Sequence, residues 1–350
     1  MTTKLLIFRR GFCAQSVVVA AALWVLAGCG QQPSTDRVVV YTSVDRIFSE
    51  PVLRKASEDL GLEVIGVYDT EETKSTGLVN RLLARRDSPD GDIFWSGDPA
   101  RAALLKSQGI TESYDSPTSV DIPSHFKDEG DHWIGFSARA RVLLVNTDMV
   151  LEGDEPKSIF DLTKPEWKGR VAIANPLFGT TSFHVAALFD KLGDERAKQW
   201  FDDLKTNDVS IVSSNGEVKR QVASGQLAVG LTDSDDAGEA MKDGAPVRSV
   251  LLDQGGTDPL GNLVMPNTVS LIRNGPNPEG ARKVVDYLLG SSVQRMLAES
   301  CAQAPLSPGV DAPGNVVSLD TVVPMNVNYS AVADKLEEIM PYLKEWAESR

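Results

Sequence analysis

The fold of this chain is decided by a strand, a turn and a helix start that follow one another in a single stretch, Asp92-Ile93-Phe94-Trp95-Ser96-Gly97-Asp98-Pro99. The apolar run through Trp95 predicts a buried strand that ends at Ser96-Gly97. Asp98-Pro99 is typical of a helix start and predicts a helix that runs to Gly109. The same order of strand, polar loop and helix recurs on both sides of this stretch, which predicts a mainly parallel sheet flanked by helices.

The elements before this stretch have the same order. They are a strand over 38–41, a helix from about residue 49 that ends at Gly61, a strand over 63–68 and a helix around 78–83. In sheets of this kind ligands bind at the carboxyl ends of the strands. Ser43, Asp45 and Ser96 follow strand ends, so we expect them to contact a ligand.

A second alternating set follows and predicts a second lobe, for which 350 residues give enough chain. It comprises strands over 141–146, 171–174, 209–212 and 226–231, with helices around 185–188 and 218–222, before a strand over 267–272 returns to the first lobe. The expected domains are therefore lobe 1 at 37–140, lobe 2 at 141–265, and a return to lobe 1 at 266–350. The last part ends in a C-terminal packing helix that Pro341 should kink or divide.

The N-terminus predicts export. Lys4, Arg9 and Arg10 precede an apolar segment over 17–27, which as a helix would reach only ~16 Å of the ~30 Å hydrocarbon thickness. A signal peptide over 1–28 is therefore favoured over a spanning helix. Leu26-Ala27-Gly28-Cys29 resembles the lipobox of bacterial lipoproteins, which implies lipidation of Cys29, a tether over 29–36 and a lipid-anchored protein of the cell envelope, periplasmic or extracytoplasmic. The alternative is an ordinary secretory leader with an incidental cysteine.

Composition excludes several classes of function. A net charge of −14 argues against a nucleic-acid partner. With Cys13 in the leader and Cys29 acylated, Cys301 alone remains in the folded part, so neither an intramolecular disulfide nor a multi-cysteine metal site is expected. The common catalytic signatures are missing and His184 is interpreted as structural, so we expect no enzyme.

Three acids crowd the stretch Gly230-Leu231-Thr232-Asp233-Ser234-Asp235-Asp236-Ala237, directly after a predicted strand. Asp233, Asp235 and Asp236 there predict a site for a cation or an amine. The alternative is a helix N-cap followed by acids that suit the positive end of a helix.

Two other groups suit an anion. Arg139 and Arg141 lie two residues apart at a predicted strand start, so they share one side and could converge on an anion; alternatively, one pairs with an acid and the other is solvated. Gly179, Thr180 and Thr181 begin a predicted helix and suit a phosphate, phosphonate or carbonate, or simply cap the helix.

The chain resembles the solute-binding proteins of ferric-iron-type ABC transporters. The resemblance is carried by Tyr41-Thr42-Ser43-Val44-Asp45-Arg46, Tyr68-Asp69-Thr70-Glu71, Asp92-Ile93-Phe94-Trp95-Ser96-Gly97, Ser137-Ala138-Arg139-Ala140-Arg141-Val142-Leu143-Leu144-Val145-Asn146, Gly230-Leu231-Thr232-Asp233 and Pro266-Asn267-Thr268-Val269. It implies two α/β lobes joined by a hinge, a ligand in the cleft, closure on binding and a membrane permease as partner.

The resemblance also implies a ligand. Ferric-binding relatives hold iron largely through tyrosines, including an adjacent pair where this chain has Asp235-Asp236, and Asp45 lies near the N-terminal ligand position of relatives. Carboxylates suit hard cations, so Asp45, Asp235 and Asp236 are the expected metal ligands. We expect a monomer with no cofactor that carries ferric iron together with a small anion; the alternative ligand is an organic zwitterion or amine such as an aminophosphonate.

Overall fold

The computed structural model describes residues 36–348 except 70–76 and 258. The predicted signal peptide, Cys29 and nearly all of the tether lie outside the described residues. None of the helices in the described part of the chain combines the length and apolarity that a membrane-spanning helix requires. Residues 35–350 form one compact unit with its own hydrophobic core, so this segment contains what it needs to fold by itself.

The first half of the sheet is parallel. Strand β1 (Arg37–Thr42) lies between β2 (Glu63–Tyr68) and β3 (Ile93–Ser96), and the helices α1 (Arg46–Leu60), α2 (Gly77–Ala84) and α3 (Pro99–Ser107) alternate with these strands. Asp98 caps α3 by accepting from the backbone N–H of Ala100, as its position before Pro99 predicts. Helix α1 begins earlier than expected, directly after Asp45.

The second half is built in the same way. Strand β6 (Val171–Ala174) lies between β7 (Ser210–Val212) and β8 (Val229–Asp233), all parallel. Helices α4 (Gly179–Leu192), α5 (Asp194–Thr206), α6 (Asn215–Ala223) and α7 (Ser234–Lys242) connect or follow these strands. Strand β8 lies later in the chain than the predicted strand, so Asp233 is its last residue and α7 starts at the next residue.

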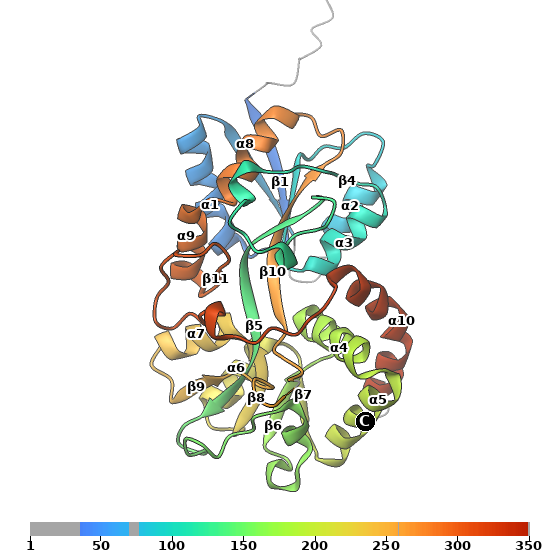
Figure 1. Cartoon of the computed structure of the whole chain (residues 1–350), viewed down its shortest axis with the longest axis vertical. Coiled ribbons are helices and arrows are strands. Elements are labelled where there is room, and N and C mark those ends of the chain that lie inside the picture. Colours follow the sequence, from blue (N-terminus) through green and yellow to red (C-terminus); the bar gives the residue numbers. More distant parts are fainter. Residues whose placement is uncertain (1–35, 70–76, 258, 349–350) are drawn as a thin grey trace, which may run out of the picture. The chain divides into compact units, whose positions relative to one another are not determined.

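Two long antiparallel strands join the halves. Strand β5 (Ile134–Asn146) pairs with β10 (Val264–Ile272) over residues 134–140 and with β8 over residues 141–145. Figure 1 shows β5 and β10 side by side between the two sets of strands. The sheet is therefore mixed, and the expectation of a mainly parallel sheet holds only for its two ends. Arg139 and Arg141 lie well inside β5 instead of at a strand start.

The remaining elements complete the two halves. They are β4 (Thr111–Glu112), β9 (Val247–Val250), α8 (Pro278–Leu288), α9 (Ser291–Cys301), β11 (Ala304–Pro305) and α10 (Tyr329–Glu348). Helix α10 packs on α3 and α4. Its Trp346 also lies edge-on to Phe201 of α5, with 4.8 Å between the ring centroids. The helix continues through Pro341, so the expectation that this proline divides it is wrong. The buried apolar side chains on both sides of the proline hold the helix together despite the missing N–H donor.

Candidate functional site

The site is centred on the carboxylate of Asp233, which terminates β8 and is only 6% exposed. Its Oδ1 accepts from Nη1 of Arg141 at 2.6 Å. Its Oδ2 accepts from the hydroxyl of Thr180 at 2.6 Å and from Nδ2 of Asn215 at 3.0 Å, and lies 3.3 Å from Nε of Arg139. Four donors from β5, α4 and α6 thus converge on one carboxylate.

The charge balance explains the state of Asp233. Burial raises the pKa of Asp233, but the charges of Arg141 and Arg139 and the hydrogen bonds from Thr180 and Arg141 outweigh burial and hold the pKa below its usual value. Asp233 is therefore ionised at neutral pH and serves as the counter-charge of both arginines.

Arg141 is bonded to its neighbours through Nη1 and Nη2, whereas its buried Nε has no hydrogen-bond partner. Its guanidinium, 1% exposed, donates to Asp233 and to Oδ1 of Asn215 at 3.2 Å, with the hydroxyls of Thr180 and Thr181 at 3.3 and 3.5 Å. Both arginines that could converge on an anion thus converge on the same acid. The two arginines therefore converge on an anionic side chain of the protein itself, and the alternative in which one of them is solvated is wrong.

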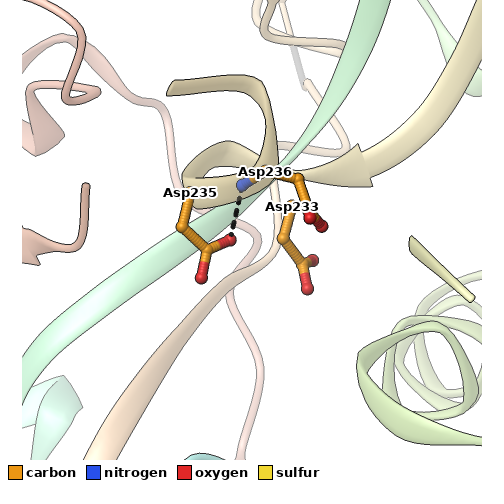
Figure 2. A group of neighbouring side chains, drawn as sticks. All are labelled: Asp233, Asp235 and Asp236. Atoms are coloured by element: carbon orange, nitrogen blue, oxygen red, sulfur yellow. Dashed lines mark hydrogen bonds between the residues drawn. The ribbon is translucent and has the colours of Figure 1, made fainter. Parts of the chain in front are cut away.

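Asp235 and Asp236 lie in the first turn of α7, beside Asp233 (Figure 2). Ligand atoms of the three carboxylates all lie within 4.8 Å of one another. Asp235 accepts from the backbone N–H of Asp236 at 3.1 Å, and Asp236 accepts from the hydroxyl of Thr232 at 2.9 Å. Asp233 is the N-cap residue of α7 but forms no side-chain cap hydrogen bond, whereas Asp235 and Asp236 lie in the first turn, as the capping alternative expects.

The pKa values of Asp235 and Asp236 are shifted in the opposite direction from that of Asp233. Burial, together with repulsion from Asp233 and Asp236, raises the pKa of Asp235 although Arg139 opposes the shift. Burial and the charge of Asp233 likewise raise the pKa of Asp236, against the nearby charge of Lys219, whose Nζ lies 3.8 Å away. The surroundings of Asp235 and Asp236 therefore disfavour the ionised carboxylates. A cation bound to their oxygens would take the place of the proton and stabilise the charged forms.

The start of α4 lies against the same network. Its N-cap is Phe178, without a side-chain cap bond, so the threonines do not cap the helix as the sequence suggested. The hydroxyls of Thr180 and Thr181 are used instead by Asp233, Arg141 and Asn215. Gly179 has a positive φ of 59°, which favours glycine at this position.

The predicted residues of the first half are engaged differently. The hydroxyl of Ser43 accepts from the N–H of Gly97 at 3.1 Å and so joins the loops at the ends of β1 and β3. The hydroxyl of Ser96 donates to the carbonyl of Asp98 at 2.8 Å, within the loop after β3. Asp45 is the N-cap of α1. Among the described residues, the group of acids close enough to share an ion contains Asp235 and Asp236 with Asp233, and Asp45 is not part of it.

Sequence reasoning missed Asn215 and Lys219. Asn215 opens α6 and bonds to Thr180, Thr181, Arg141 and Asp233, so it joins four parts of the network. Its only signal in the sequence is its place after a strand and after the N-cap Ser214. Lys219, one turn further along α6, carries the positive charge that faces Asp236.

His184 makes stability depend on pH. Burial lowers the pKa of His184 to about 3, and Arg141 adds to this effect against Asp233. The unfolded chain binds a proton near pH 6.5, whereas the folded chain stays neutral, so stability is lost as pH falls below 6.5. Chemical denaturation should show that His184→Gln removes about 2 kcal/mol of the wild-type stability loss between pH 7 and pH 5. An unchanged pH dependence would contradict this assignment.

Comparison with known proteins agrees with the fold and the binding role. The model of the family described as bacterial extracellular solute-binding protein matches residues 90–326. The chain belongs to this family. As a family member it is a solute-binding protein that acts outside the cytoplasm, and the expected binding role in place of an enzymatic one is confirmed.

Relatives and solved structures resemble this solute-binding protein over most of its length. It is 24% identical over 321 residues to iron uptake protein A1 of Synechocystis, covering 87% of each chain. It is 23% identical to the major ferric iron-binding protein of Neisseria meningitidis serogroup B, covering 90% of this chain and 94% of the relative. The crystal structure of apo ferric ion-binding protein A of Pasteurella haemolytica matches with a TM-score of 0.79 at 21% identity, over 89% of this chain and 98% of the other. The two-lobed binding-protein fold expected from the sequence is thereby confirmed.

Proposed function

We propose that this solute-binding protein is the ligand-capturing component of an ABC importer and that it delivers ferric iron, bound together with a small anion, to a membrane permease. The observation that carries the proposal is the group formed by Asp233, Asp235 and Asp236, whose ligand atoms lie within 4.8 Å of one another at the carboxyl end of β8. Carboxylate oxygens are suitable ligands for a hard cation.

The parts of this group have separate roles. Asp233 is already saturated by four donors, so Asp235 and Asp236 supply the oxygens that face the iron. The start of α4, which lacks a side-chain cap, suits the accompanying anion because its first backbone N–H groups point out of the helix. Relatives named for iron uptake and for ferric iron binding support this choice of cargo.

An organic zwitterion is the weaker alternative. Both arginines of the site are paired with Asp233, so the acidic group of a zwitterion would have to bind at the start of α4 without the charge of a free arginine. Binding of a zwitterion is therefore tested alongside iron in the binding experiment below.

The proposed anchor completes the role. Lipidation at Cys29 would hold a monomeric binding protein at the membrane surface close to its permease. The anchor rests on the sequence Leu26-Ala27-Gly28-Cys29, which lies outside the described residues.

Titration calorimetry on residues 35–350 tests the cargo directly. Ferric citrate, ferric iron with carbonate, Mg²⁺, Ca²⁺, 2-aminoethylphosphonate and putrescine are compared on the same preparation. We expect saturable one-to-one binding of ferric iron, and at 100 times its dissociation constant a gain of about 2.7 kcal/mol in unfolding free energy. Binding of 2-aminoethylphosphonate or putrescine without any binding of iron would overturn the proposal.

A further inference from the structure

Arg139 occupies the point on β5 where the strand changes partners. Residue 139 is paired with Met265 of β10, whereas residue 141 is paired with Asp233 of β8. A side chain at this position can therefore reach the ends of strands from both halves of the sheet.

Arg139 contacts residues at strand ends in both halves of the sheet. Its Nη2 donates to the carbonyl of Gly97, directly after β3, at 2.6 Å, and its Nε lies 3.3 Å from Oδ2 of Asp233 at the end of β8. The N–H of Gly97 in turn donates to the hydroxyl of Ser43 after β1. One guanidinium, 11% exposed, thus joins the loops after β1 and β3 to the acid at the end of β8.

Arg141 differs from Arg139 in the parts of the fold that it contacts. Arg141 makes all of its contacts within the second half of the fold, to Asp233, Thr180, Thr181 and Asn215. Of the two guanidiniums, Arg139 alone bonds to the first half. Loss of Arg139 leaves Asp233 with its contacts to Arg141, Thr180 and Asn215, so the network of the second half persists.

Gly97 lies in a confined place beside the guanidinium. A Cβ atom at residue 97 would lie 3.3 Å from Oδ1 of Asn267, which is tight, and 3.9 Å from Nη1 of Arg139, which is an ordinary contact. The charges that face Arg139 are those of Asp233, Asp235, Asp98 and Asp236, which come from both halves and favour its charged form against the effect of burial.

We propose that Arg139 is a positioning residue that ties the end of β3 to the end of β8 and so sets the spacing across the binding site, without contacting the ligand itself. This inference depends on the proposed function in one respect, the choice of ferric iron as the ligand for the binding test. Binding proteins of this kind close by moving one half against the other. A tie at the strand that connects the halves restricts that motion.

The test uses residues 35–350 with Cys301→Ser and two spin labels, at Lys55→Cys on α1 and Lys198→Cys on α5, both on exposed side chains. Pulsed electron paramagnetic resonance measures the distance between the halves. We expect Arg139→Met to broaden the distance distribution without ligand, and Arg139→Lys, which keeps the charge but loses the planar fork, to give an intermediate result. Arg46→Met, which removes an exposed arginine paired with Glu50 on α1, is the control and should leave the distribution unchanged.

Measurements of ferric affinity distinguish a positioning role of Arg139 from direct contact with the ligand. We expect Arg139→Met to weaken binding by about 10- to 100-fold, to the same extent with carbonate, phosphate or citrate as the accompanying anion. An unchanged distance distribution overturns the proposal, and so does a loss of affinity confined to one anion, because the latter marks Arg139 as an anion ligand. If the wild-type protein binds no iron, the proposed function fails, while the distance measurement still decides whether Arg139 is a tie.

Discussion

Asp233→Asn lowers the free energy of unfolding by about 3–5 kcal/mol, because it leaves the buried guanidiniums of Arg139 and Arg141 without their counter-charge. Asparagine has nearly the same shape as aspartate, so the change removes charge without opening a cavity. The four donors around Asp233 are arranged for two anionic oxygens, and the amide nitrogen of Asn would face at least one of them. Urea denaturation of residues 35–350 measures the effect.

Glu50→Gln is the matched control for this variant. It also neutralises an acid that is paired with an arginine, but both partners, Glu50 and Arg46, are exposed on α1. Such a surface pair contributes about 0–1 kcal/mol. If Asp233→Asn destabilised the protein no more than Glu50→Gln does, the central role of Asp233 would be refuted.

The double variant Asp235→Asn/Asp236→Asn is expected to weaken ferric binding by about 100-fold or more, because it removes two charged oxygen ligands from a partly desolvated site. The same variant should not lower the unfolding free energy at pH 7.5. The surroundings raise the pKa of both acids, so the folded protein gains nothing from their charged forms and tolerates neutral side chains there. Calorimetry and urea denaturation on one preparation give both results.

A neighbouring pair of acids provides the control for the double variant. Asp202 and Asp203 are adjacent on α5, far along the chain from the site, so Asp202→Asn/Asp203→Asn makes the same change in charge. It should leave ferric affinity within about two-fold. Equal loss of affinity in the two double variants would mean that net charge, and not the site, attracts the iron.

The two predictions separate acids that stand close together in one stretch. Asp233 holds two arginines and so is expected to stabilise the fold, whereas the surroundings of Asp235 and Asp236 disfavour their charged forms, and the proposed function assigns these two acids to the cation. Sites that bind ligands often carry such unfavourable electrostatics in the folded protein.

Much of the fold was predictable from local patterns. The strand over 63–68 and the strand over 171–174 have the boundaries that the apolar runs predict. Strand β5 was predicted only from residue 141, because Ser137 and Arg139 interrupt its apolar pattern and conceal the part that begins at Ile134. Ser137 bonds to Gln303 and Asn267, and Arg139 bonds to Gly97 and pairs with Asp233, so contacts with distant parts of the chain outweigh the hydrophobic pattern there.

The site was predictable only in part. The sequence placed Arg139 and Arg141 at a strand start, Asp233 after a strand and Thr180 at a helix start, and the structure brings them together. It gave no indication that Asn215 completes the network. Asn215 belongs to an ordinary capping pattern, Ser214 followed by Asn215, and nothing local distinguishes it from other helix starts.

The sequence by itself determined the fold class, since the alternation of strand and helix follows from periodicities of about 2 and 3.6 residues that each segment carries locally. It also determined where the acids and arginines stand along the chain. Only the tertiary structure decided which charges compensate one another. The partners come from β5, α4, α6 and β8, up to 94 residues apart in the pair of Arg139 with Asp233. Their contacts depend on the position of side chains that no local pattern contains.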